Sequence, residues 1–218
     1  MNPSTAPCRT CPHKGTGVCG ALGMGLAGTS LPVSQSEFRA RAIICRPHQP
    51  ETRLIILCDG LALKFYGLTD GQRQILSLRR PGFFVLGGSA FAERTGFSAM
   101  ALTDAKVALV SRSEVLARIA GVPSIVTRLA SIFEIDHTDM AELAVDLGRR
   151  DAEQRISHLF LKLAQWLGAT VEDNACSMKV ILRQEDIADF TGLTTAHVNR
   201  TLGKLRRHQL DMVLALDG

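Results

Sequence analysis

The sequence predicts an α+β protein, with strands in its first half and helices in its second. Three observations support this prediction: short apolar runs separated by turn signals before Ser111, apolar residues at helical spacing after it, and a helix-turn-helix pattern near the end. The 218 residues suffice for one large domain or two modest ones. Hydrophobic residues make up 46% of the chain and charged residues 21%, which excludes disordered and low-complexity classes.

Three of the six cysteines are close together near the start of the chain, with the spacing C-x2-C-x7-C: Cys8, Cys11 and Cys19. The proline and glycine residues around them predict an irregular loop, which can bring thiolates to one metal centre. No signal-peptide pattern or long apolar run is present, so we expect a cytoplasmic protein, no membrane association, and thiols or metal ligands rather than disulfides. The alternative is three unligated cysteines on a mobile tail. A fourth ligand could be any of Cys45, Cys58, Cys176 and His13.

The next part of the chain is expected to be a linker at residues 20–36, followed by a β-rich region. This region contains the runs RAIIC, RLIILC, LALKFYGL, QILSL, FFVLGG, SAMAL and KVALVS. Turn signals separate them, including Asp59-Gly60 and Asp70-Gly71, and the second of these is typical of a hairpin. Runs this short predict an antiparallel sandwich or barrel.

Three helices are predicted after this region. They are a short helix from Ser113 to Ile119, a long one over residues 124–148, and a third from Ala152 to Leu167. The long helix has an apolar stripe with one polar interruption: Leu129, Phe133, Asp136, Met140, Leu143 and Leu147. Such a stripe is either a core face or the seam of a two-helix dimer. In a dimer, Asp136 and Asp139 would repel their counterparts and weaken the pairing.

The most specific motif is RQEDIADFTGLTTAHVNRTLGKL at residues 183–205. A helix-turn-helix requires a small residue at the helix crossing, a glycine at the turn and a β-branched anchor, and Ala188, Gly192 and Val198 supply these. Thr194 is expected to cap the second helix. The segment after it is rich in Lys and Arg and contains no acid, although the whole chain has a net charge of only +4. A packing αα-hairpin is the alternative.

The second helix of such a motif presents its first turns to the major groove of double-stranded DNA. Thr195, Ala196, Asn199 and Arg200 are therefore the predicted base readers, and Lys204, Arg206 and Arg207 the predicted phosphate contacts. The full set of predicted DNA contacts is Gln184, Thr194, Thr195, Ala196, His197, Asn199, Arg200, Lys204, Arg206 and Arg207.

The order of these parts resembles the Crp/Fnr family of bacterial transcription regulators, most clearly in RRDAEQRISHLFLKL and LRQEDIADFTGLTTAHVNRTLGKL. The resemblance implies a cysteine-rich loop and linker at 1–36, a β-roll sensor domain (a cupin-like double-stranded β-helix) at 37–120, a dimerisation helix at 121–150 and a winged helix-turn-helix at 151–218. The cysteine motif resembles the Fnr branch, which implies an oxygen-sensing [4Fe-4S] cluster on Cys8, Cys11 and Cys19.

The sequence departs from the family pattern at several points. Leu109 stands where the fourth cluster cysteine is expected, so Cys58 is the first substitute and Cys45 the second. Ala196 replaces a base-reading Glu, so the usual half-site is not expected. The wing is expected to be short. Gly82-Phe83-Phe84 lacks the acid that holds a cyclic nucleotide, which disfavours that effector.

Together these features predict a homodimeric regulator that binds a pseudo-palindromic DNA site and responds to oxygen or redox state, and the resemblance implies RNA polymerase as a further partner. The alternatives are a zinc or thiol sensor and a regulator that responds to a small effector. No nucleophile elbow, P-loop, dinucleotide fingerprint or H-E-x-x-H motif occurs, so no catalytic residues and no enzyme activity are predicted.

Overall fold

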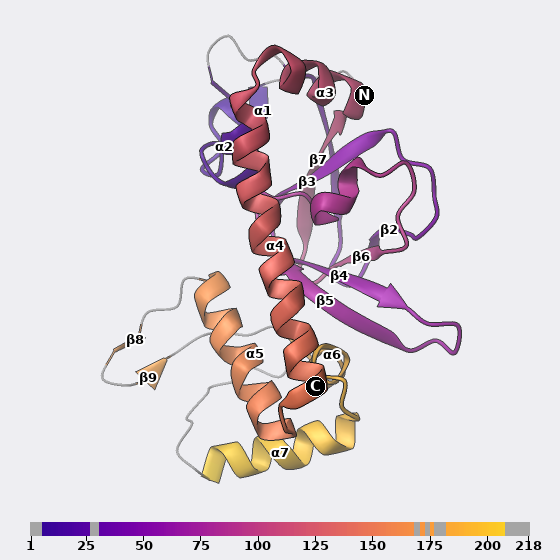
Figure 1. Ribbon diagram of the computed structural model, residues 1–218, viewed down its shortest axis with the longest axis vertical. Helices are drawn as coiled ribbons and strands as arrows, with labels where there is room; N and C mark the ends of the chain where they lie inside the picture. Colours follow the sequence, from indigo (N-terminus) through magenta and orange to yellow (C-terminus); the bar gives the residue numbers. More distant parts are fainter. Residues whose placement is uncertain (1–5, 27–30, 168–170, 173–174, 177–181, 208–218) are drawn as a thin grey trace. The chain divides into compact units, whose positions relative to one another are not determined.

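The computed structural model describes residues 6–26, 31–167, 171–172, 175–176 and 182–207 (Figure 1). The chain forms two compact units. We call the first, Met1–Gly67 with Ser77–Asp139, the sensor unit, and the second, Leu68–Leu76 with Met140–Gly218, the helical unit. Each is described by itself.

The sensor unit contains two antiparallel sheets. One has the strand order β1-β7-β3, formed by β1 (Val33–Phe38), β7 (Ala105–Ser111) and β3 (Arg53–Asp59). The other has the order β2-β6-β4-β5, formed by β2 (Ile43–Cys45), β6 (Ser98–Ala101), β4 (Ala62–Gly67) and β5 (Arg73–Arg79). The arrangement agrees with the predicted β-roll. The turn between β4 and β5 forms at Asp70-Gly71 as predicted, because Gly71 has a φ of +86° and Leu68 N donates to Gln72 O.

Two expectations about this region need correction. The run FFVLGG is not a strand: only Phe84 makes an isolated bridge, to Ile56, and a short 3-10 helix, η1 (Gly87–Phe91), follows. The expected linker at 20–36 is partly structured, because β1 pairs along its length with β7. The polar residues within β1, Ser34, Gln35, Ser36 and Glu37, concealed it from a search for apolar runs.

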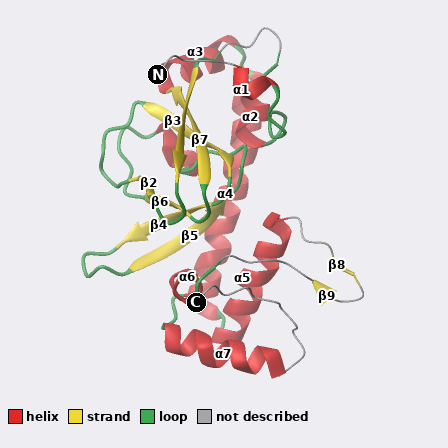
Figure 2. Cartoon of the chain, turned by 180° about the vertical axis from the view of Figure 1, so that it is seen from behind, coloured by secondary structure: helices red, strands yellow, loops and turns green. Residues whose placement is uncertain are grey.

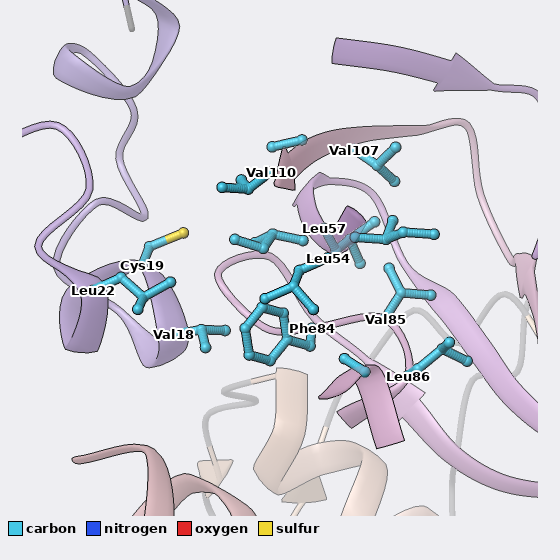
Figure 3. Packing of buried hydrophobic residues seen from close by; sticks show 14 of the residues in the cluster. Val18, Cys19, Leu22, Leu54, Leu57, Phe84, Val85, Leu86, Val107 and Val110 are labelled. Carbon is cyan, nitrogen blue, oxygen red and sulfur yellow. The ribbon is translucent and has the colours of Figure 1, made fainter. Parts of the chain in front are cut away.

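The core of the sensor unit fills the space between the sheets and the N-terminal helix α2 (Gly17–Leu22). Figure 3 shows Val18, Cys19 and Leu22 on α2 facing strand residues such as Leu54 and Val110. All but Cys19 of these five are inaccessible to solvent, and Cys19 is 8% exposed. The N-terminal segment from α2 onward is therefore part of the packed unit and not a tail.

Two helices follow the last sensor strand, α3 (Arg112–Gly121) and α4 (Ser124–Arg149), close to the predicted bounds. They meet at Pro123, which cannot continue a helix from the preceding turn but suits the start of the next. Among the described helices, none alone is long and apolar enough to cross a membrane, whereas α3 and α4, bent by 120°, satisfy length and composition together.

The helical unit consists mainly of α5 (Ala152–Leu167), α6 (Gln184–Thr191) and α7 (Thr195–Arg207), which contact one another (Figure 2). A strand pair, β8 (Val171–Glu172) and β9 (Ala175–Cys176), lies between α5 and α6 in the sequence. Helix α5 begins at a capping box, since Gln154 N donates to Asp151 Oδ1 and Asp151 N donates to Gln154 Oε1. The predicted wing lies outside the described residues.

Candidate functional site: the helix-turn-helix and the cysteine cluster

The predicted helix-turn-helix forms from α6, the turn at Gly192 and α7. Gly192 has a φ of +64°, which favours glycine, and an added Cβ would lie 2.9 Å from Leu147 Cδ2. Ala188 and Val198 are buried where the helices cross. Thr194 caps α7 as predicted, because its Oγ1 accepts a hydrogen bond from His197 N at 3.2 Å.

The two faces of α7 differ sharply in composition. The buried face carries Val198, Thr201, Leu202 and Leu205. The predicted DNA contacts that the structure leaves exposed are Thr194, Thr195, Ala196, His197, Asn199, Arg200, Lys204 and Arg206. Gln184, at the start of α6, is half-buried, and the side chain of Arg207 lies outside the described part of the chain. The structure thus brings eight of the ten predicted contacts to one accessible surface.

Side chains that the sequence interpretation missed hold this surface in place. Arg155, on α5, donates to Leu147 O at 2.9 Å and to Thr191 O at 3.1 Å, and so connects α4 to the end of α6. Lys204 pairs with Glu153 at 3.2 Å, so this predicted phosphate contact also has a partner within the chain. No local sequence signal identifies Arg155 or Glu153, because their partners are distant in the chain.

Arg73, the first residue of β5, belongs to the segment Leu68–Leu76 of the helical unit and contacts α6. Arg73 donates to Asp186 at 3.0 Å and to Asp189 at 2.6 Å. The Asp186 side chain is 1% exposed and also accepts a bond from Arg183 N, which begins α6. Burial raises the pKa of Asp189 above its usual value, and the opposing effect of the bond to Arg73 offsets this only in part.

The predicted metal ligands come from three elements and a loop. Cys8 lies on α1 (Ala6–Arg9), Cys11 in the following loop, Cys19 on α2 and Cys58 on β3. We call these four residues the cysteine cluster. Burial, together with the charges of Cys8 and Cys11, raises the pKa of Cys58 to about 12. Burial also raises the pKa of Cys19 to about 12, with smaller contributions from the other three thiols. The four thiols are therefore electrostatic neighbours.

Backbone contacts fix one side of the cysteine cluster. Val18 N and Cys19 N both donate to Gly82 O, at 2.9 and 3.3 Å, so the first turn of α2 is anchored to the sensor unit. Gly25 has a φ of +77°, and an added Cβ would overlap Cys8 O. Arg118 on α3 donates to Leu22 O at 2.6 Å, which ties the end of α2 to the helix that precedes α4.

Cys58 occupies an irregular position on its strand. Leu57 pairs with Val107 and Asp59 with Lys106, so Cys58 is one extra residue on β3 at a β-bulge. A bulge redirects the side chain of the inserted residue. Among the described residues, no group of three or more His, Cys, Asp or Glu is arranged to hold a metal ion. The cysteine cluster is thus a group of neighbouring free thiols without closed coordination geometry.

Cys45, the second candidate for the fourth ligand, lies on β2 and not on an element of the cysteine cluster. Burial raises its pKa to about 11, and the charges that act on it are those of Glu51 and Lys64. Cys176 lies on β9, where its side chain is outside the described part of the structure. His13 is half-buried in the loop after Cys11.

The predicted dimer stripe on α4 divides into two groups. Leu129 is 4% exposed in the sensor core, Phe133 stacks on Phe84, and Asp136 pairs with Arg79 at 2.5 Å. Leu129 is buried within the chain, so the prediction that it faces a second helix is wrong. Phe133 and Asp136 are half-buried with partners in the chain, and their place in a dimer seam stays a prediction. Met140 is 37% exposed, and Leu143 and Leu147 are half-buried.

A pocket in the sensor unit tests the small-effector alternative. It is lined in part by Arg46, Arg53 and Arg112 and has a volume of about 90 Å³. Sites for small molecules usually measure about 300–1,000 Å³. Arg112 donates to the backbone oxygens of Glu51 and Ala92, which occupies its guanidinium with the chain itself. This pocket is too small for a cyclic nucleotide.

Comparisons with known proteins agree with this geometry. A family model described as a Crp-like helix-turn-helix domain matches residues 154–210. The activator AadR of Rhodopseudomonas palustris is 30% identical over 97% of this chain and 87% of its own length. FnrL of Cereibacter sphaeroides is 28% identical over 73% of this chain and 63% of its own length.

Solved structures show the same fold. FixK2 of Bradyrhizobium japonicum superposes with a TM-score of 0.68 and 23% identity, covering 82% of this chain and 86% of the other. The regulator TTHA1359 of Thermus thermophilus superposes with a TM-score of 0.62, covering 81% and 87%. The relatives are transcription regulators and not enzymes. The chain therefore belongs to the Crp/Fnr family of transcription regulators, whose helix-turn-helix binds DNA.

Proposed function

We propose that this regulator acts in the cytoplasm as a homodimer and responds to oxygen or redox state through a [4Fe-4S] cluster held by Cys8, Cys11, Cys19 and Cys58. The observation that carries the proposal is the convergence of these four free thiols from α1, its following loop, α2 and the bulge of β3. Four thiolates are the usual ligand set of such a cluster. RNA polymerase is the further partner that family membership suggests.

The ligand set favours Cys58 over Cys45 on electrostatic grounds. The charges of Cys8 and Cys11 act on Cys58, whereas Glu51 and Lys64 act on Cys45.

A bound cluster would supply an oxygen-sensitive link between the N-terminal segment and the sensor sheet. Contacts within the chain connect that link to α4. Cys19 belongs to α2, Arg118 binds the last turn of α2 through Leu22 O, and α3 leads directly into α4 at Pro123. Order in α2 therefore favours one position of α3 and, through it, the start of α4.

The dimer proposal rests on the outward face of α4. At 3.6 residues per turn, one exposed stripe lies between about 60° and 160° around the helix from the buried Leu129: Thr127, Ala130, Glu134, His137, Ala141, Ala144 and Gly148. All seven are exposed, and most are small, which allows two helices to approach closely. We propose this stripe as the pairing seam, in place of the stripe predicted from the sequence.

The cluster is tested by purifying the protein without oxygen and measuring visible absorption, iron and sulfide before and after exposure to air. We expect a brown protein that bleaches in air and contains about four irons per chain. Cys58→Ala should lose the colour and most of the iron, whereas Cys45→Ala should keep both. A colourless, iron-free protein that still dimerises and binds DNA would overturn the cluster and leave a zinc or thiol sensor to be distinguished by metal analysis.

The seam is tested by Ala141→Arg, which places a charge where two helices should touch. We expect a monomer by sedimentation and a loss of affinity for a two-half-site DNA. Ala117→Arg is the matched control, because Ala117 is an exposed helical alanine on α3. A dimeric Ala141→Arg protein would refute this seam.

A further inference from the structure

Lys64, on β4 of the sensor unit, is a buried amine without an oxygen partner. It is 8% exposed, and its Nζ lies 4.0 Å from the centre of the Phe97 ring. The other four lysines whose side chains the structure describes each have an oxygen within hydrogen-bond distance of Nζ: Lys14 (Arg9 O), Lys106 (Glu37), Lys162 (Glu142) and Lys204 (Glu153). Lys162 is as deeply buried, at 9%, yet a carboxylate oxygen lies 2.6 Å from its Nζ. Among these five lysines, Lys64 is the one whose charge no oxygen stabilises.

The surroundings of Lys64 disfavour its ammonium form. Burial and the charge of Arg79 lower the pKa of Lys64 to about 8, and the charges of Asp136 and Cys45 oppose this only in part. A fraction of the Lys64 side chains is therefore a neutral amine near neutral pH. A neutral amine is a nucleophile, whereas an ammonium ion has no free electron pair to donate.

The same surroundings would favour a negative group at this place. The side chain of Arg79 is 7% exposed, and its two terminal nitrogens donate to Asp136. Its Nε is buried and has no acceptor within the described part of the chain. A carboxylate attached to Lys64 would offer an acceptor and an opposite charge to this guanidinium. Arg79, which disfavours the ammonium form of Lys64, would therefore favour a modified, anionic form.

A small pocket gives access to this part of the sheet. Cys45 of β2 is one of the residues that line the pocket of about 90 Å³ in the sensor unit. Cys45 and Lys64 pair with Ala99 of β6 from opposite sides, so the two residues share a face of the sheet with a methyl group between them. Carbon dioxide is a neutral molecule of three atoms, so it needs little room and no charged entrance.

We propose that Lys64 is a modification site that takes up carbon dioxide as a carbamate. The amine nitrogen attacks the carbon atom and a nitrogen–carbon bond forms, while one carbon–oxygen π bond opens to give the carboxylate. One amine proton leaves to the solvent, so the charge at Lys64 becomes negative. The step needs no oxidant, reductant or metal, and loss of carbon dioxide reverses it. This site is independent of the cysteine cluster and adds a second signal to the proposed response to oxygen.

The modification would act on α4 through Arg79. Asp136 lies on α4, and its pair with Arg79 holds the first half of this helix against β5. A carbamate on Lys64 competes with Asp136 for the guanidinium, so it favours states in which α4 is held less firmly. Carbon dioxide should therefore weaken DNA binding, a consequence that rests on the proposed pairing of α4.

The first test locates the carbamate in the wild-type chain. The full-length, oxygen-free protein is equilibrated with carbon dioxide or with argon at a pH near the pKa of Lys64. Carbamates are then trapped by alkylation with triethyloxonium and located by mass spectrometry of peptides. We expect an adduct on Lys64 under carbon dioxide and none under argon. Lys162 is the internal control, because it is equally buried but paired with a carboxylate, and it should carry none.

The second test measures DNA affinity with and without carbon dioxide, at constant pH and ionic strength. Affinity of the wild type should fall about fivefold or more under carbon dioxide, the size of a typical coupling between two sites. Lys64→Arg should not respond, because a guanidinium stays charged and is not a nucleophile. Lys162→Arg is the matched control and should respond as the wild type does.

The outcomes separate the carbamate from the regulatory function. A wild-type protein without an adduct on Lys64, or with as much adduct on Lys162, would overturn the site whatever the variants do. An adduct on Lys64 with the same DNA affinity in both gases would overturn its action through Arg79. A protein that binds no DNA in either gas fails the proposed function, and the trapping experiment still decides the modification.

Discussion

Two buried cations show how single residues in the sensor unit depend on their surroundings. The side chain of Arg79 is 7% exposed and pairs with Asp136 through two hydrogen bonds. Lys64 is also buried, and its ammonium lies 4.0 Å from the centre of the Phe97 ring. Charges in such places are costly unless they are paired or neutralised.

Removing the partner of Arg79 should be strongly destabilising. Asp136→Ala leaves a buried guanidinium unpaired, so we expect the free energy of unfolding to fall by about 3 kcal/mol or more. Glu37→Ala removes an exposed pair with Lys106 and should have a much smaller effect, because solvent screens such a pair. Urea unfolding of both variants at low ionic strength measures the difference. Equal losses would show that burial of the Arg79 pair is not decisive.

Lys64 predicts a pH dependence of stability. Burial, with a contribution from the charge of Arg79, lowers its pKa from 10.5 to about 8. Between these two values the unfolded chain binds more protons at this site than the folded chain, so the stability of the folded state rises with pH. Relative to Lys64→Met, which does not titrate, the wild type should gain up to about 3 kcal/mol between pH 8 and pH 10.5.

The measurement is urea unfolding of both proteins across this range, followed by circular dichroism. The comparison with Lys64→Met matters because the cysteines, whose pKa values are raised, act in the opposite direction at high pH in both proteins. A constant difference between the two proteins would show that Lys64 is not buried as a charged group.

At the scale of an element, the helix-turn-helix depends on glycine in two different ways. Gly192 ends α6 with a left-handed conformation and lies against Leu147, whereas Gly203 is in the middle of α7 with open space around it. The first glycine is required by backbone geometry and packing. The second lowers the helix propensity of α7 and leaves the surface flat.

Alanine should therefore have opposite effects at these two positions. Gly192→Ala should destabilise the helical unit by about 1–3 kcal/mol, because a left-handed alanine is strained and its Cβ crowds Leu147. Gly203→Ala should stabilise it by up to about 1 kcal/mol. Trp166, on α5, is the single tryptophan of the chain and reports the unfolding of this unit by fluorescence. A neutral Gly192→Ala variant would contradict the role of the turn.

At the scale of the whole molecule, the charge is unevenly distributed. The net charge is only +4, yet the exposed face of α7 carries Arg200, Lys204 and Arg206 with no acidic residue between them. Phosphate contacts release counterions, so affinity for DNA should fall steeply as salt increases.

The slope of this salt dependence shows which basic side chains contact DNA phosphates. Arg206→Ala should reduce the slope of log affinity against log salt by about one per protomer and weaken binding to all sequences alike. Arg39→Ala, an exposed arginine in the sensor unit, should leave the slope unchanged. An unchanged slope in Arg206→Ala would mean that this residue does not contact phosphate.

The sequence by itself determined the elements whose signals are local. The bounds of α3, α4 and α5 were predictable to within about two residues from capping residues, proline and apolar spacing, and the motif at 183–205 placed α6 and α7, since these signals act within one or two turns of a helix. The hairpin at Asp70-Gly71 and the cap at Thr194 were predictable for the same reason. The strand β1 was not, because its pairing with β7 provides stability that its polar residues do not reveal.

Only the tertiary structure decided which face each residue occupies. The apolar stripe from Leu129 to Leu147 suits a core face and a dimer seam equally well. Contacts with Phe84 and Arg79 place its first half against the sensor unit. Likewise, the proximity of Cys58 to Cys8 and Cys11 depends on a bulge and on the docking of α2. Contacts between residues fifty positions apart arise from the folded chain as a whole, so no local pattern encodes them.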